Sequence, residues 1–218
     1  MDITPFIQTL GNLNLIFVVK SFVAMFVIVD AFGLIPIFMT LLENYSEGDR
    51  KAMIDMAIKI ATISLIVLTL TGNVIFQILG ISIDSFRIAG GIILLIISIE
   101  MLFGRRTKTS SGEIDEIDKV DIAVTPMAIP LLTGPGAITT GIVLMAEADT
   151  MTNVIILLLN IVLVFVISSI IFHRMYLVYR ILGRTGVKVL TRIMGLLLAA
   201  ISVQFVIDGI HGAFGLGL

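Results

Sequence analysis

Two short segments interrupt stretches of sequence that are otherwise long and apolar. The first, residues 30–36, begins with the carboxylate of Asp30 and ends with Pro36. The second, residues 133–139, contains a Gly-Pro-Gly sequence at positions 134–136. In hydrocarbon an unsatisfied backbone amide is costly, so irregular chain is tolerated only where protein encloses it or where it lines a cavity. The two interruptions therefore predict a cavity inside the apolar part of the molecule.

Asp30 is the only acidic residue placed deep within an apolar segment. A charge buried in a membrane costs at least about 2.5 kcal/mol on insertion scales, so this carboxylate needs a partner such as an ammonium group, a cation or a proton. The alternative is that Asp30 only caps a helix that restarts near Gly33. Thr133, its counterpart in the second interruption, is neutral. The two interruptions therefore differ in chemistry, and Asp30 is also the predicted site of ion coupling.

Each interruption is expected to begin a half-helix, one near Gly33 and one near Gly136. The unpaired amides and positive dipole end of such a half-helix suit a carboxylate. A carboxylate-binding pole beside an acidic side chain fits a zwitterion, and the small Ala31 and Ala137 leave room for only a short side chain. Thr139 and Thr140 can bind either a ligand or their own backbone. The predicted substrate-binding residues are Asp30, Ala31, Phe32, Gly33, Thr133, Gly134, Pro135, Gly136 and Ala137.

The composition indicates an all-α membrane protein, because 58% of the residues are hydrophobic and only 14% are charged. A spanning helix needs about 20 apolar residues. Without cysteine, disulfide, thiol-redox and iron–sulfur chemistry are excluded. His173 and His211 are not at metal-ligand spacing, so we expect no metal and no other cofactor. Six segments are long enough to span: 14–42, 53–79, 86–103, 122–147, 153–180 and 190–210.

Basic residues are concentrated in the connections after the first, third and fifth segments. Lys and Arg favour the cytoplasmic side of a membrane, which predicts that these three connections are cytoplasmic and that both termini lie outside a cell membrane. The opposite face holds only Arg87 with certainty. The ten residues that set this bias are Arg50, Lys51, Arg105, Arg106, Lys108, Lys119, Arg174, Arg180, Arg184 and Lys188.

The chain also repeats itself. The two interruptions superpose at an offset of 103, and residues 78–80 and 181–183 share the sequence Ile-Leu-Gly at the same offset. Residues 87–91 match 192–196 at an offset of 105. Because each unit holds three spans, the second unit must enter the membrane inverted, as in many secondary transporters. We therefore expect repeat 1 at 1–103, a cytoplasmic linker at 104–121 and repeat 2 at 122–218, with the first and fourth helices discontinuous.

Three further charged residues leave alternatives open. Arg87 and Arg192 begin equivalent helices at opposite faces, where snorkelling towards the interface is the ordinary interpretation and gating is the alternative. Glu100, near the cytoplasmic end of the third segment, either snorkels or relays protons.

Three motifs resemble those of a known family. They are Val29-Asp30-Ala31-Phe32-Gly33-Leu34-Ile35-Pro36-Ile37-Phe38, Ala128-Ile129-Pro130-Leu131-Leu132-Thr133-Gly134-Pro135-Gly136-Ala137-Ile138 and Arg87-Ile88-Ala89-Gly90-Gly91. With them the chain is similar to the MarC family of integral membrane proteins, whose transporter branch is the SnatA type of small neutral amino acid transporter. The resemblance implies discontinuous first and fourth helices and ion-coupled uptake of glycine, alanine and similar amino acids. Ala31 and Leu34 stand where many members have Pro and Asn.

The sequence therefore predicts a secondary transporter of small neutral amino acids that works by alternating access, with a proton, or else sodium, as the coupling ion. The expected partners are this substrate, the ion and the lipid bilayer, with no nucleic acid. An exporter of amino acids or other small solutes, or a membrane channel, is the alternative. An enzyme is not expected, because Gly-x-Ser-x-Gly and cysteine are absent and Asp30 has no acidic partner in another span.

Overall fold

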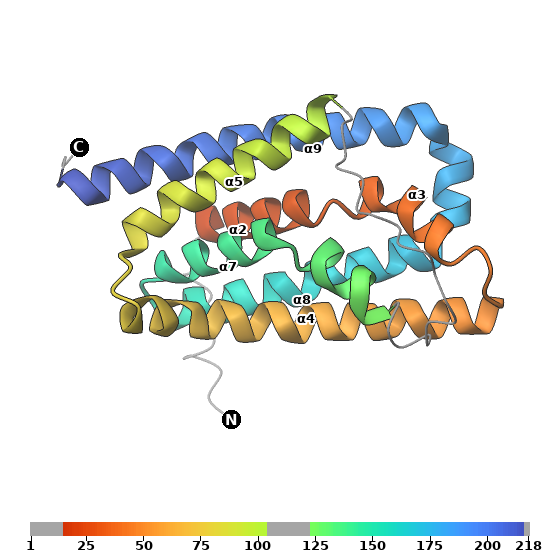
Figure 1. Cartoon of the computed structure of the whole chain (residues 1–218), viewed down its shortest axis with the longest axis horizontal. Coiled ribbons are helices and arrows are strands. Elements are labelled where there is room, and N and C mark those ends of the chain that lie inside the picture. The colour runs from red at the N-terminus through yellow and green to blue at the C-terminus, as the bar shows by residue number, and fades with distance from the viewer. Residues whose placement is uncertain (1–14, 104–122, 216–218) are drawn as a thin grey trace, which may run out of the picture.

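The computed structural model describes residues 15–103 and 123–215, and every regular element in these ranges is a helix (Figure 1). The predicted linker at 104–121 and the two chain termini lie outside the described residues. The helices, in chain order, are α2 Leu15–Val29, α3 Ala31–Leu41, α4 Glu47–Ile78, α5 Ile83–Phe103, the π-helix η1 Ala123–Leu132, α7 Pro135–Ala146, α8 Met151–His173 and α9 Met175–Phe214.

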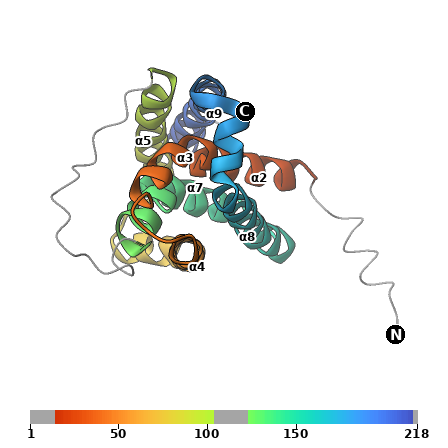
Figure 2. The same cartoon turned by 90° about the vertical axis from the view of Figure 1, so that its right-hand side faces the viewer.

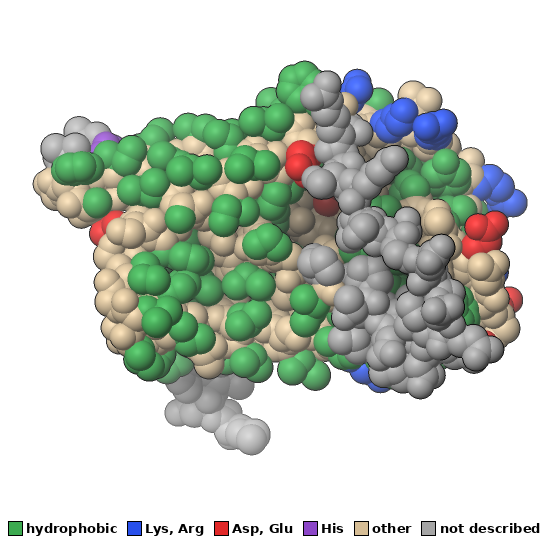
Figure 3. All heavy atoms as spheres, viewed as in Figure 1, with side chains coloured by type: hydrophobic (Ala, Val, Ile, Leu, Met, Phe, Trp, Pro, Cys, Tyr) green, Lys and Arg blue, Asp and Glu red, His purple; other side chains and the backbone are tan. Residues whose placement is uncertain are grey.

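Five of the described segments are long and apolar enough to cross a membrane. Large apolar side chains are exposed along them, and they cover much of the surface in Figure 3. Exposed apolar surface on this scale suits a lipid environment. The fourth predicted segment, 122–147, is built instead from η1 and the short apolar helix α7. The five segments are Leu15–Leu41, Glu47–Ile78, Ile83–Phe103, Met151–His173 and Met175–Phe214.

Helices α5 and α9 lie side by side and make the most extensive contact between any two described helices (Figures 1 and 2). Small residues allow this close approach. A Cβ atom added at Gly91 would lie 2.7 Å from the backbone oxygen of Ser202. A Cβ atom added at Gly195 would lie 3.1 Å from the backbone oxygen of Ser98. The two backbones therefore meet with almost no side chain between them.

Helices α3 and α7 lie in the middle of the molecule, between the α5–α9 pair and helices α4 and α8 (Figures 1 and 2). Buried aromatic packing joins this middle layer to α8, because the Phe38 and Phe172 rings stack at 4.1 Å between centroids. Asn160 of α8 donates to the backbone oxygen of Val18 at 3.0 Å and to the Ser21 hydroxyl at 2.8 Å on α2. The elements that carry the two interruptions are thus enclosed by other helices.

The boundary between the fifth and sixth segments differs from the prediction. The predicted segments 153–180 and 190–210 place a connection between them, but those residues lie within α9, which kinks at Gly183 (φ 61°, ψ 178°). The chain turns earlier, because α8 ends at His173 and α9 begins at Met175. Gly183 can adopt this positive φ without a Cβ clash, so the helix bends there instead of ending. The first part of α9 runs across the right-hand end of Figure 1.

Candidate functional site

The first interruption is a single residue in a left-handed conformation. Helix α2 ends at Val29, Asp30 has φ 42° and ψ 54°, and α3 begins at Ala31. Asp30 is the one non-glycine residue with positive φ among the described residues. Aspartate tolerates this conformation better than most residues, since its short polar side chain hydrogen-bonds locally. Its Oδ1 accepts the amide of Gly33 at 3.2 Å and so caps α3. With 5% of its surface exposed, the carboxylate is buried.

The second interruption has a different construction. The π-helix η1 ends at Leu132, and the amide of Thr133 donates to the backbone oxygen of Ala128 at 3.0 Å. Gly134 is extended (φ −68°, ψ 171°) and precedes α7, whose first residue, Pro135, has no amide hydrogen. Among the described residues no side-chain hydrogen bond caps α7. The first amides of a helix lack intrahelical partners, so this helix presents its positive end to whatever lies before it.

The two interruptions line one cavity of about 310 Å³. Asp30 contributes from the first and residues 134–137 contribute from the second. Apolar side chains, including Leu34 and Ile97, form other parts of the wall. This volume is at the small end of the range of about 300–1,000 Å³ for ligand pockets. An acidic side chain and an uncapped helix N-terminus thus share one small, mostly apolar cavity.

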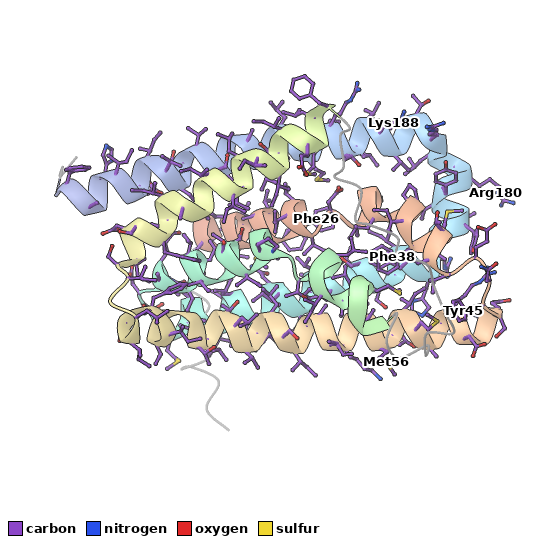
Figure 4. All side chains as sticks on the ribbon, viewed as in Figure 1. Phe26, Phe38, Tyr45, Met56, Arg180 and Lys188 are labelled. Carbon is purple, nitrogen blue, oxygen red and sulfur yellow. The ribbon has the colours of Figure 1, made fainter. Side chains whose placement is uncertain are left out.

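Four of the predicted substrate-binding residues lie outside the cavity lining. Ala31 is buried, and Phe32 packs edge-on against Phe26, with ring centroids 6.3 Å apart; Figure 4 labels Phe26 close to the interruption. Gly33 contributes its amide to Asp30. The Thr133 hydroxyl donates to the backbone oxygen of Ala61 on α4, at 3.4 Å.

The two further threonines lie one turn into α7. The Thr140 hydroxyl donates to the backbone oxygen of Gly136 at 2.8 Å, as the self-bonding alternative predicted. Thr139 is buried, and its side chain faces Gly90 of α5. Neither residue lines the cavity. The predicted substrate-binding residues that do line it are Asp30, Gly134, Pro135, Gly136 and Ala137.

Helix α5 supplies a cavity wall that was not included in the predicted site. Ile97, Glu100 and Met101 line the cavity, and their i, i+3, i+4 spacing places them on one helix face. Glu100 and Met101 also line a second cavity of about 260 Å³, together with Lys188 and Arg192 of α9. The sequence signal that could have identified this wall is Glu100, an acidic residue in the otherwise uncharged second half of α5. Within residues 15–103 and 123–215 no cluster of three acidic or histidine side chains could hold a metal ion.

Comparison with known proteins decides the family. The profile of the MarC family of integral membrane proteins matches residues 15–214. The chain belongs to this family. It is 38% identical over 203 residues to a UPF0056 membrane protein of Methanocaldococcus jannaschii, covering 92% of this chain and 99% of the relative.

Two other relatives are also UPF0056 membrane proteins. A UPF0056 membrane protein of Archaeoglobus fulgidus is 40% identical, with 92% of this chain and 94% of the relative covered. One of Aquifex aeolicus is 35% identical, with coverages of 88% and 91%. Their names describe membrane proteins and state no substrate, so membership of the MarC family makes this chain a multi-pass integral membrane protein. No solved structure gives a significant match.

Proposed function

We propose that this MarC-family protein is a secondary active transporter of small neutral amino acids such as glycine and alanine, with a proton as the coupling ion. One observation carries the proposal: Asp30 and the N-terminus of α7 line the same small cavity. Helix interruptions that meet in a cavity are where many transporters bind their substrates.

The two poles of the cavity match the two charges of an amino acid. The Asp30 carboxylate attracts an ammonium group. The Gly33 amide is taken by Asp30 itself, so the N-terminus of α3 is already capped. The uncapped N-terminus of α7 therefore receives the substrate carboxylate, at the amides of Gly136 and Ala137. No arginine is needed at this site.

Close packing around Gly136 limits the substrate side chain. A Cβ atom added there would lie 2.7 Å from Cδ1 of Ile28 and 2.9 Å from Cδ1 of Ile97. These side chains leave no space for a large substituent beside the carboxylate pole. Glycine, alanine and serine should therefore be accepted, and leucine and phenylalanine should be poor substrates.

Reciprocal contacts support an inverted repeat with two broken spans. Gly91 meets Ser202 and Gly195 meets Ser98. An offset of 104 relates Gly91 to Gly195 and Ser98 to Ser202, so each residue of α5 meets the equivalent of the other in α9. Such exchanged contacts are expected across a two-fold axis. The offset of 105 inferred from sequence, which matched Gly90 to Gly195, is therefore shifted by one residue at this seam. Alternating access follows if one repeat rocks against the other.

The charge distribution supports the proposed orientation. Lys and Arg side chains gather at the right-hand end of Figure 3, where Figure 4 labels Arg180 and Lys188. This end is the cytoplasmic one by the positive-inside rule. We expect a tag inserted after Ser110 to be cytoplasmic and one appended after Leu218 to be external, by protease protection in intact cells. Finding both tags on one side contradicts the inverted arrangement.

Uptake into proteoliposomes tests the proposed activity. Purified protein should accumulate labelled glycine and alanine when an inward proton gradient is imposed, with sodium gradients varied independently. Unlabelled alanine should compete, whereas glycine methyl ester and ethylamine, which lack the carboxylate, should not. Competition by the ester as strong as that by alanine contradicts the α7 pole. Counterflow against a preloaded pool separates a carrier from a channel, because only a carrier exchanges bound substrate.

A further inference from the structure

A cluster of four charged side chains joins three elements at one end of the molecule. Glu147 directly follows α7 and accepts from Lys20 of α2 at 2.6 Å. It also pairs with Arg87 of α5 at 3.8 Å, and Arg87 pairs with Asp84 at 3.5 Å. We call these four residues the outer cluster. The side chains of Arg87 and Glu147 are only 19% and 16% exposed, so solvent screens this pair less than a surface ion pair.

The outer cluster lies beyond an apolar plug. Buried Val27, Val143 and Phe205, from α2, α7 and α9, form one cluster of the core, and the partly buried Val23 and Phe86 pack against it. Residues at the other end, including Glu100, line the substrate cavity and the adjoining second cavity. Apolar side chains are therefore packed on the side of the outer cluster, and the two cavities lie on the side of Glu100.

The repeat relates Glu147 to a residue at the hollow end. Thr150 caps α8 and Ser46 caps α4, each by accepting the amide three residues on. Glu147 and Glu43 stand three residues before these two caps, at the same offset of 104 as the α5–α9 contacts. The helix contacts follow the same relation, because α5 packs against α7 and its counterpart α9 packs against α3, the counterpart of α7. The position equivalent to Arg87 is Thr191, and Arg192 follows it directly; both line the second cavity.

The corresponding charged residues are Glu43 and Arg192, which follows the equivalent position Thr191, and they are not paired in this structure. Among the described residues no ion pair joins Glu43 to Arg192. Glu43 is exposed, and its backbone oxygen accepts from Arg50 at 2.7 Å. Arg192 lies beside Glu100 and Lys188 at the second cavity. The Arg87–Glu147 pair is thus formed. The Glu43–Arg192 pair is not formed, and Arg192 lies on the side of the cavities.

From this asymmetry we infer that Arg87–Glu147 is the outer gate of the transport path and that Glu43–Arg192 is its inner counterpart. The inference rests on the proposed function and adds the residues that close each side. In the outward-open state Arg87 separates from Glu147, leaving Asp84 and Lys20 as their remaining partners. Arg192 then meets Glu43, and Glu100 and Lys188 are the charged groups that face this inner pair. Because one of the two pairs is always formed, the path is never open at both ends.

A single-cysteine reporter tests the outer gate, since the chain has no cysteine of its own. Val23→Cys places a thiol on α2 between the outer cluster and the cavity. Its reaction with a membrane-impermeant maleimide is measured in right-side-out and inside-out vesicles. Glu147→Gln and Arg87→Gln should each raise labelling from the outer side by about fivefold or more, the lower end of typical coupling between two states. Arg87→Lys keeps the charge and should label as the parent does.

The inner pair should act in the opposite direction. Glu43→Gln and Arg192→Gln remove interactions of the outward-open state, so outer labelling of the reporter should fall. A purely structural role of either pair would not give changes of opposite sign. Lys51→Ala breaks the exposed Lys51–Glu47 pair (2.8 Å) and is the matched control that leaves labelling unchanged. Each variant is first checked for monodisperse elution, and the two independent outer variants guard against misfolding of one.

The two proposals fail in different ways. Unchanged labelling in both outer variants, with normal glycine counterflow, overturns the gate assignment and leaves the transporter intact. Increased labelling in both outer variants, with no glycine counterflow by the parent protein, supports the gate and overturns the proposed substrate. Labelling that changes in the same direction for outer and inner variants also overturns the gate assignment.

Discussion

The two helix interruptions occupy matching places in the chain but are built in opposite ways. At the first, one acidic residue in a left-handed conformation makes the break and caps the helix that follows. At the second, a π-helix gives way to Gly134 and Pro135, and no side chain caps α7. The first interruption therefore presents a negative side chain, and the second presents the positive end of a helix. The two interruptions thus supply the two opposite poles that the proposed site for a zwitterion requires.

Asp30 has two distinguishable roles in the structure, as the cap of α3 and as a carboxylate that lines the cavity. Its Oδ1 caps α3, as the structural alternative predicted, and the residue lines the cavity as well. A cap contributes about 0.5–2 kcal/mol, and asparagine caps as well as aspartate does. The cap therefore does not require a charge. A neutral asparagine would cap α3 equally well. The presence of an acidic residue at this buried position therefore points to a role for its charge.

The largest effect is expected from Asp30→Asn. The amide keeps the cap and tolerates the left-handed backbone, but it neither attracts an ammonium group nor takes up a proton. Gradient-driven glycine uptake in proteoliposomes should fall to the level of empty liposomes, while the protein still elutes as a single species. Normal driven uptake by this variant would reduce Asp30 to a cap.

Gly136→Val tests the opposite pole. Its Cβ would clash with Ile28 and Ile97 and fill the space before the α7 amides. Overpacking costs about 1–3 kcal/mol, so glycine affinity should fall by roughly 5- to 150-fold in equilibrium binding, at 1.4 kcal/mol per tenfold. Gly48→Val, at a site where a Cβ meets nothing within 4 Å, is the matched control. Equal glycine binding by the two variants would contradict the proposal that the N-terminus of α7 binds the substrate carboxylate.

A smaller effect is expected on thermal stability, where Asp30→Ala and Asp30→Asn distinguish the capping role of Asp30 from the role of its charge. Asp30→Ala loses the cap, worth about 1 kcal/mol, and forces alanine into a left-handed conformation at a further cost of about 1 kcal/mol. Thermal unfolding in detergent should therefore show Asp30→Ala to be clearly less stable than Asp30→Asn, which should match the parent within about 0.5 kcal/mol. Equal melting of the two variants contradicts the capping geometry.

The smallest effect is expected from Thr133→Val. The Thr133 hydroxyl donates to Ala61 on α4 at 3.4 Å and does not line the cavity. The near-isosteric valine removes one hydrogen bond, worth about 1 kcal/mol of stability, and should change glycine affinity by less than about twofold, since that bond is made to α4. A tenfold loss of affinity in the same binding assay would place Thr133 in the site.

Sequence alone predicted the multi-span helical fold. It also singled out Asp30 and residues 134–137, which line one cavity in the structure; that they bind a substrate stays a prediction. It could do so because prolines, glycines and a lone carboxylate are conspicuous in apolar segments. It did not assign the α5 wall to the site. Lipid-facing helices are apolar on nearly all sides, so no polar stripe reveals which face of α5 turns inwards. The early turn at Arg174 was missed because helix-compatible residues lie on both sides of it.

The glycine-lined seam between α5 and α9 has an evolutionary consequence. Its contacts are self-complementary, because the face that carries Gly91 and Ser98 meets an equivalent face that carries Gly195 and Ser202. A surface of this kind can pair with a second copy of itself. If the chain is the inverted repeat proposed above, an ancestral gene encoding a single three-helix unit would already have had a dimer interface, provided that its product inserted in both orientations. Fusion of two copies would then have fixed one unit in each orientation and freed the two interruptions to acquire different chemistry.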